Sequence, residues 1–297
     1  MNRWIFNWLT SLAAGMPLWL GYGLAHVFSV VHYAFFPNRR HAVLANLAVI
    51  KPGTSRKERA HMAREIMRNY NAFLFEFFRL PHLDRDELLR RIDVEGKEHL
   101  DAAAAQNRGL IMVSSHIGNW ELAGVILAWW GHHVYAVAGV QISRWLSPAV
   151  RETKSEMAVT TVAPEDGFKK LYRAIESKGT VALLADGDIY SHPVMVDLFG
   201  RKTPMPAGPA VLGMRTGALV LTGYTVRLPG GRFKAVVEPA LDPNTFATSG
   251  EFSQAIAARL ERQVREHIDQ WCIFRPMWEP ETVPEEATAA AARKVTA

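Results

Sequence analysis

The sequence lacks most of the motifs that would assign a function directly. Its 297 residues include one cysteine, Cys272, which excludes a disulfide framework and any metal site with several cysteine ligands. It has no Walker A or Gly-x-Gly-x-x-Gly pattern, no His-Glu-x-x-His zinc motif, no Gly-x-Ser-x-Gly nucleophile elbow and no internal repeat. Hydrophobic residues make up 49% and charged residues 21%, which is ordinary globular usage and argues against a disordered or collagen-like chain.

Acidic residues are absent from the first 57 positions, which carry six Lys or Arg. The other 240 residues hold 28 Lys and Arg against 29 Asp and Glu, so their net charge is −1 although the whole chain is +5. A nucleic-acid-binding protein is expected to carry its positive stripe on the folded domain. The sequence therefore indicates no nucleic-acid partner.

The 35 residues from Trp4 to Asn38 carry no formal charge. About 20 apolar residues suffice to cross a bilayer, and aromatic residues gather towards both ends of this stretch, as interface anchors do. The stretch is too long for the apolar region of a cleaved signal peptide, which spans about 7 to 15 residues. We predict a membrane anchor over residues 1–40. A core helix hairpin, broken at Pro17 or at Gly21 and Gly23, is the alternative.

Five of the six N-terminal cations follow the uncharged stretch: Arg39, Arg40, Lys51, Arg56 and Lys57. The positive-inside tendency then places the rest of the chain in the cytoplasm, against the anionic surface of the membrane.

An amphipathic helix is expected over residues 55–80, and beyond it apolar runs alternate with helical segments. The predicted strands are 110–113, 134–137, 160–162, 181–184, 219–226 and 233–237, and the predicted helices are 97–106, 119–130, 145–157, 166–178, 207–216 and 251–268. This alternation predicts an α/β fold: a mostly parallel sheet with helices on both faces, and an antiparallel edge hairpin turning near Pro229. We expect one catalytic domain over residues 41–281 and a frayed or disordered Ala/Glu-rich tail over 282–297.

The most informative stretch is His116-Ile-Gly-Asn-Trp-Glu121, where a predicted strand ends and a helix begins. Open α/β sheets bind ligands at such strand ends. A turn at Gly118 and Asn119 would let Glu121 hold one nitrogen of His116 while the other nitrogen removes a proton, and backbone N–H groups of the turn would stabilise an oxyanion. The alternative is a buried turn histidine followed by a favourable first-turn acid. A nucleophile at Ser114 or Ser115 is disfavoured because the elbow motif is absent.

This motif resembles the His-x4-Asp/Glu motif of glycerolipid acyltransferases, and its six-residue form resembles the bacterial lipid A biosynthesis (late) acyltransferases and relatives that acylate mannosylated phosphatidylinositol. The resemblance covers most of the chain, including an N-terminal apolar anchor, Ala185-Asp186-Gly187-Asp188, Leu198-Phe199-Gly200, Pro206-Ala207-Gly208-Pro209-Ala210 and Gln270-Trp271 before Arg275. It departs in the middle block, where Ala138-Gly139-Val140-Gln141 stands in place of a Tyr-Arg-Pro-like segment. That departure leaves the acceptor lipid open.

The resemblance implies transfer of a fatty acyl group from acyl carrier protein or coenzyme A to a hydroxyl of a membrane glycolipid, with a lipid A precursor as the leading acceptor. A mannosylated phosphatidylinositol or a lysophospholipid is the runner-up. It also places Asp186 in the active site, polarising His116 or orienting the acceptor, with Asp188 beside it. Candidate substrate contacts are Arg144, Arg201, Lys202 and Gly208. No cofactor is expected. A catalytically degenerate lipid-binding or scaffolding protein, or a hydrolase that uses water as acceptor, stays open.

Overall fold

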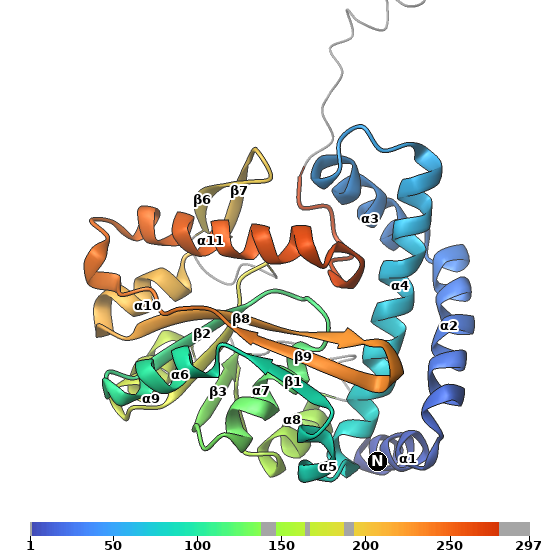
Figure 1. Cartoon of the computed structure of the whole chain (residues 1–297), viewed down its shortest axis with the longest axis horizontal. Coiled ribbons are helices and arrows are strands. Elements are labelled where there is room, and N and C mark those ends of the chain that lie inside the picture. Colours follow the sequence, from blue (N-terminus) through green and yellow to red (C-terminus); the bar gives the residue numbers. More distant parts are fainter. Residues whose placement is uncertain (1, 138–146, 164–166, 187–192, 279–297) are drawn as a thin grey trace, which may run out of the picture.

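The computed structural model describes residues 2–137, 147–163, 167–186 and 193–278 (Figure 1). Arg144, Asp188 and the tail 282–297 lie outside these described residues, so the predictions made for them are not addressed. Four helices open the chain and stand as a layer beside an α/β body: α1 (Asn2–Gly15), α2 (Leu18–Phe35), α3 (Pro37–Ile50) and α4 (Arg56–Arg79).

The body is built on a seven-stranded sheet in the order β1-β9-β8-β2-β5-β3-β4, in which β8 and β9 are antiparallel and every other neighbouring pair is parallel. Its strands are β1 (Ile92–Glu95), β2 (Leu110–Ser114), β3 (Val134–Val137), β4 (Val159–Val162), β5 (Thr180–Leu184), β8 (Leu219–Leu228) and β9 (Arg232–Val237). The predicted α/β class is confirmed. The predicted edge position of the hairpin is wrong, because β1 pairs with β9 and forms the edge itself.

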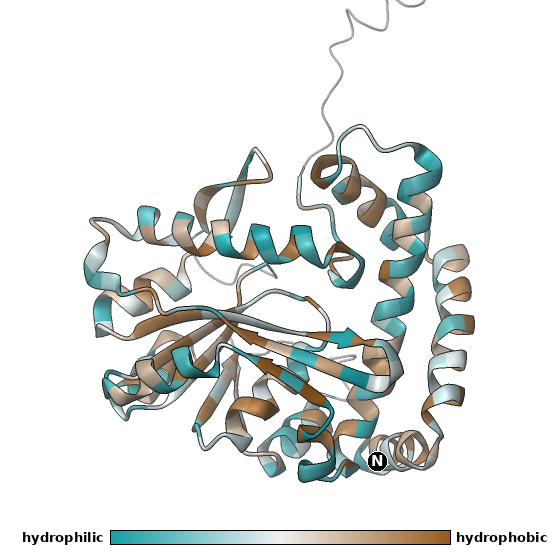
Figure 2. Cartoon of the chain, in the orientation of Figure 1, coloured by the Kyte–Doolittle hydropathy of each residue, from teal (hydrophilic) through white to brown (hydrophobic). Residues whose placement is uncertain are grey.

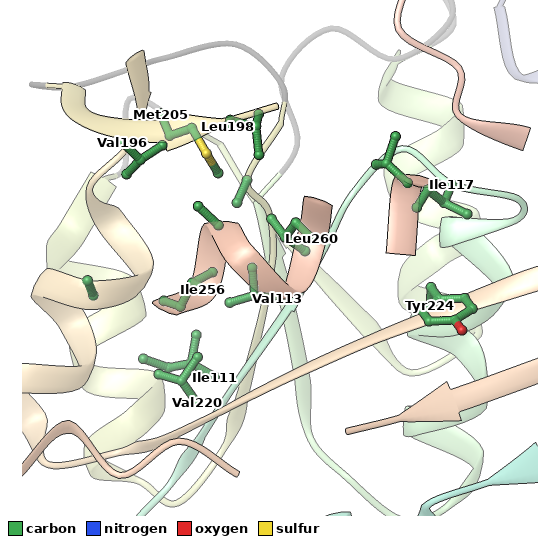
Figure 3. Close-up of a cluster of buried hydrophobic side chains, with 14 of the residues drawn as sticks. Ile111, Val113, Ile117, Val196, Leu198, Met205, Val220, Tyr224, Ile256 and Leu260 are labelled. Carbon is green, nitrogen blue, oxygen red and sulfur yellow. The ribbon is translucent and has the colours of Figure 1, made fainter. Parts of the chain in front are cut away.

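Helices cover both faces of the sheet because its central strands are apolar on both sides. In β2, Ile111 and Val113 face one cluster, which includes residues of α9 (Gly167–Glu176), α10 (Gly208–Thr216) and α11 (Ser249–Glu266) (Figure 3). Leu110 and Met112 face the other cluster, with residues of α6 (Lys97–Ala105) and α7 (Trp120–Trp129). Two further helices, α5 (Arg85–Leu89) and α8 (Ser147–Glu156), and a separate antiparallel hairpin of β6 (Pro193–Leu198) and β7 (Arg201–Pro206), lie at the periphery.

The uncharged N-terminal stretch forms two helices that separate at Pro17, and both pack against α4. Gly21 permits the close contact, since a Cβ there would lie 2.0 Å from the ring of Phe75. The Arg79 guanidinium holds the turn by donating to the carbonyls of Ala13 at 3.0 Å and Met16 at 2.5 Å. By length and composition α2 is able to cross a membrane. The break between α1 and α2 at Pro17 is the one expected for a helix hairpin.

The outward faces of α1 and α2 carry large apolar side chains that nothing in the described chain covers. The most exposed are Trp4, Trp8, Trp19, Val27, Phe28, Val30 and Phe35. Helix α4, between this pair and the body, alternates hydrophilic and apolar bands along its length, and a Ser55–Glu58 capping box fixes its first turn (Figure 2). The helical layer is therefore apolar on its outer side, where a soluble protein would be polar.

Candidate active site

His116 lies just beyond the carboxyl end of β2, and the pairing of β2 with β5 decides what it meets. These strands are parallel with Ser114 opposite Leu184, so two residues further on His116 comes beside Asp186. The backbone N–H of His116 donates to Asp186 Oδ2 at 2.8 Å, and its Nδ1 lies 2.8 Å from Asp186 Oδ1. A carboxylate can only accept, so Nδ1 carries the hydrogen and Nε2 is left to take a proton.

Asp186 is 5% exposed, and it accepts a third hydrogen bond from the indole N–H of Trp271, 2.7 Å from Oδ2. Burial by itself would raise the pKa of the Asp186 carboxyl, but the charge and hydrogen bonds of His116, with the bond from Trp271, outweigh burial and hold this pKa below its ordinary value. The site therefore keeps a charged carboxylate against the inner nitrogen of a quarter-exposed imidazole.

The carboxylate on His116 Nδ1 thus differs from the one predicted by spacing. Glu121 forms an ion pair with Lys154 of α8, with Lys154 Nζ 2.7 Å from Glu121 Oε2 and both side chains largely buried. The reason is the turn: Gly118 adopts φ +60°, and α7 then starts with its first turn facing α8. Sequence spacing placed Glu121 near the motif histidine, whereas strand register gives His116 an acid 70 residues away.

The backbone N–H groups of Gly118 and Asn119, predicted to hold an oxyanion, both donate hydrogen bonds inside the protein. Gly118 donates to the carbonyl of Gln270 at 2.9 Å, and Asn119 donates to the carbonyl of Thr225 at 2.8 Å. The turn sits so close to β8 that a Cβ on Gly118 would lie 2.2 Å from Thr225 O. Asn119 instead caps α7, its Oδ1 accepting from the N–H of Leu122 at 2.9 Å.

A cavity of about 680 Å³ opens beside His116, within the range typical of ligand pockets. It runs between the sheet and α7, and aromatic side chains of α4, such as Phe73 and Phe77, form part of its wall. Most of its lining is apolar. Glu121, Lys154 and Gly208 line it together with His116, so the structure brings these four predicted or newly found residues to one cavity.

Other predicted residues lie elsewhere or are chemically quiet. Arg201 and Lys202 lie on the β6–β7 hairpin and do not line the cavity, and Lys202 pairs with exposed Asp197 at 3.1 Å. Ser115 is fully buried. Burial raises the pKa of the Cys272 thiol to about 12, so its nucleophilic thiolate is scarce near neutral pH.

Sequence reasoning missed the roles of Lys154 and Trp271. Gln270-Trp271 stood out as part of the family resemblance, but nothing local to it indicated a bond to Asp186. Lys154 carries no signal in the sequence, because it is one of two basic residues on α8, with Arg151, and only its burial at 5% exposure distinguishes it.

Comparison with known proteins identifies the class as an acyltransferase. The chain belongs to the bacterial lipid A biosynthesis acyltransferase family, whose family model matches residues 1–279. The chain is therefore an enzyme that transfers an acyl group from a donor to a lipid acceptor. Membership of this family together with the apolar helix α2 indicates association with a membrane.

The names of the matching relatives state a different acceptor, phosphatidylinositol mannoside. The phosphatidylinositol mannoside acyltransferase of Mycobacterium tuberculosis (strain CDC 1551 / Oshkosh) is 30% identical over 222 residues, covering 71% of this chain and 68% of the relative. The protein of the same name from Mycolicibacterium smegmatis is 28% identical over 221 residues, covering 73% and 72%. Among solved structures, the 1-acyl-sn-glycerophosphate acyltransferase PlsC of Thermotoga maritima matches with a TM-score of 0.41 and 15% identity, over 85% of this chain and 97% of that one.

Proposed function

We propose that the enzyme transfers a fatty acyl chain from an acyl thioester, of acyl carrier protein or coenzyme A, to a hydroxyl of a membrane glycolipid. The leading acceptor is a lipid A precursor. The observation that carries this proposal is a His116–Asp186 pair at the wall of a largely apolar cavity. Such a pair supplies a general base, and such a cavity accepts an alkyl chain at about 0.8 kcal/mol for each buried methylene.

In this mechanism Nε2 of His116 takes the proton of the acceptor hydroxyl while its oxygen attacks the thioester carbonyl. The resulting tetrahedral oxyanion collapses by breaking the C–S bond, and the leaving thiolate receives the proton from His116. Asp186 balances the imidazolium that exists between these steps. No acyl-enzyme forms, and Ser114, Ser115 and Cys272 are dispensable as nucleophiles.

The amides of Gly118 and Asn119 are already bonded, so another group has to stabilise the oxyanion. A positively charged side chain would do so. Lys154 and Arg275 are the only Lys or Arg among the described residues that line the cavity. We infer that one of them supplies the charge, with Glu121 fixing the position of Lys154.

Mannosylated phosphatidylinositol is the second candidate acceptor, favoured by the names of the two mycobacterial relatives. Purified enzyme in detergent, given an acyl thioester and either acceptor, should yield an acceptor heavier by one acyl group less one hydrogen, with release of one thiol. Mass spectrometry of lipid and intact protein reads both. Free fatty acid without acylated lipid would indicate a hydrolase, and thioester binding without turnover would indicate a degenerate binding protein. A stoichiometric adduct on protein given donor alone would replace direct transfer by a covalent route.

We also propose that residues 1–40 anchor the catalytic domain, residues 41–281, on the cytoplasmic face of a bacterial inner membrane. The support is the exposed apolar outer face of α1 and α2 together with the cations that follow it. Wild-type protein should stay with washed membranes at about 1 M salt, where the Debye length is about 3 Å, and leave only with detergent. Release by salt alone would contradict this proposal.

Two matched variants separate the apolar contribution from the charges. Replacing exposed Trp4, Trp8, Trp19 and Phe28 with Ser should move the protein to the soluble fraction, since burying each such aromatic is worth about 1.5 to 3 kcal/mol. Replacing Arg39, Arg40, Lys51, Arg56 and Lys57 with Gln removes only about 1 kcal/mol each and should leave the protein bound.

A further inference from the structure

Glu76 is a buried acid on α4 that the proposed mechanism does not use. It is 6% exposed, and its carboxylate accepts from three different parts of the chain. Tyr22 of α2 donates its hydroxyl to Oε1 at 2.9 Å, Asn119 donates its Nδ2 to Oε2 at 2.9 Å, and Arg227 of β8 donates Nε to Oε1 and Nη2 to Oε2, the latter at 2.8 Å. One carboxylate therefore joins the outer helix, the sheet and the motif turn.

Arg227 also makes several hydrogen bonds besides those to Glu76. Its Nη1 donates to Asn69 Oδ1 at 3.0 Å, and its backbone N–H and carbonyl bond the side chain of Gln270 at 2.9 and 3.0 Å. Burial would lower the pKa of Arg227, but Glu76 more than offsets burial and raises it. The pair is thus a fixed charged unit rather than a mobile surface contact.

This unit is hydrogen-bonded, directly and through Gln270, to the turn that carries His116. Glu76 accepts a hydrogen bond from Nδ2 of Asn119, while Oδ1 of Asn119 caps α7. Both ends of the Asn119 side chain are therefore bonded, which restricts its rotation. Gln270, bonded to Arg227, offers its own carbonyl to the N–H of Gly118, and the N–H of Cys272, two residues on, donates to the carbonyl of His116 at 2.8 Å. Fixing Arg227 and Glu76 therefore fixes the backbone from His116 to Asn119.

We propose that Glu76 and Arg227 are positioning residues, which hold the His116 turn in its reactive geometry and tie it through Tyr22 to the membrane-facing helix α2. This inference rests on the proposed function of His116. A buried ion pair is weak as a source of stability, because apolar residues of similar volume often stabilise a fold equally well. Its hydrogen bond from Asn119 and its link through Gln270 to Gly118 give it a use that apolar residues could not replace.

Glu76→Gln tests the proposal, with turnover of decanoyl-CoA measured per folded molecule. We expect kcat to fall by about 10- to 100-fold, because small displacements of a catalytic group are costly, and KM for the thioester to change little. Amide hydrogen exchange over residues 117–123 should quicken by about tenfold or more, as expected when a fixed segment opens locally. The exchange measurement does not depend on turnover.

Asp242→Asn is the matched control, because it breaks another side-chain ion pair, to Arg108 at 2.6 and 2.9 Å, at the amino end of β2 and so at the opposite end of that strand from the turn. It should leave kcat and exchange over 117–123 as in wild type. Asn119→Ser is the second variant: serine keeps a good helix cap but shortens the link to Glu76, so it should fold and still lose turnover.

Wild-type kcat and exchange in Glu76→Gln, or in Asn119→Ser if Glu76→Gln fails to fold, would overturn the positioning role. If instead exchange quickens as expected but His116→Ala keeps full activity, the positioning of the turn stands and the proposed role of His116 fails.

Discussion

His116→Ala should lower the rate of acyl transfer by about 10² to 10⁴, the range typical for loss of a general base. The variant should still fold. Asp186 would lose the Nδ1 contact, yet the backbone N–H of residue 116 and the indole of Trp271 would still satisfy its buried carboxylate. Initial rates with purified protein, together with circular dichroism and thermal unfolding, measure both expectations.

His132→Ala is the matched control for this variant. His132 precedes β3 and so lies at the amino ends of the parallel strands, opposite the edge that carries His116, and its Nδ1 contacts Thr180 Oγ1 at 3.2 Å. It should lose some stability and keep its turnover. Near-normal acyl transfer by folded His116→Ala would end the general-base mechanism.

The strands that could be predicted were those whose sequences are continuous apolar runs. β2, β3 and β5 are central and apolar on both faces, and their predicted bounds agree with the structure within a residue. β1 was missed because Ile92-Asp-Val-Glu95 has two acids in four residues and buries only Ile92. β6 and β7 were missed because proline at their ends reads as loop.

The candidate site was predictable as a place and less so as a set of contacts. A strand ending at His116 and another ending before Asp186 indicated one sheet edge, since parallel strands present their carboxyl ends together. Which acid meets the imidazole depends on the register of β2 against β5, and no local pattern encodes that register. The amides of Gly118 and Asn119 looked free because their acceptors are also distant in sequence. They donate to the carbonyls of Gln270 and of Thr225 in β8.

The N-terminal stretch shows a similar limit. Absence of charge from Trp4 to Asn38 indicated an apolar segment, and Pro17 marked a break. Sequence could not indicate that Tyr22 and His32 find polar partners, Glu76 and Asn71, on α4. Those contacts give α2 one face for the protein and one exposed apolar face.

The two acids near His116 can be told apart by amide substitution. Asp186→Asn should lower kcat by about 10²-fold or more, because an Asn amide facing Nδ1 donates a hydrogen and forces the imidazole into the tautomer in which Nε2 cannot act as base. Glu121→Gln should mainly destabilise the fold, by about 3 kcal/mol, because it leaves the buried ammonium of Lys154 without its countercharge. Its turnover per folded molecule should fall less than that of Asp186→Asn.

Double variants with His116→Ala complete the comparison, since residues that act as one unit lose activity together rather than additively. The double variant with Asp186→Asn should be scarcely slower than His116→Ala alone, because the carboxylate has no function once the imidazole is gone. The double variant with Glu121→Gln should multiply the two single losses, because Glu121 acts through Lys154. The reverse pattern, with Glu121 coupled to His116 and Asp186 independent of it, would return the base to the His-x4-Glu pairing and leave the 2.8 Å contact with Asp186 as a purely structural bond.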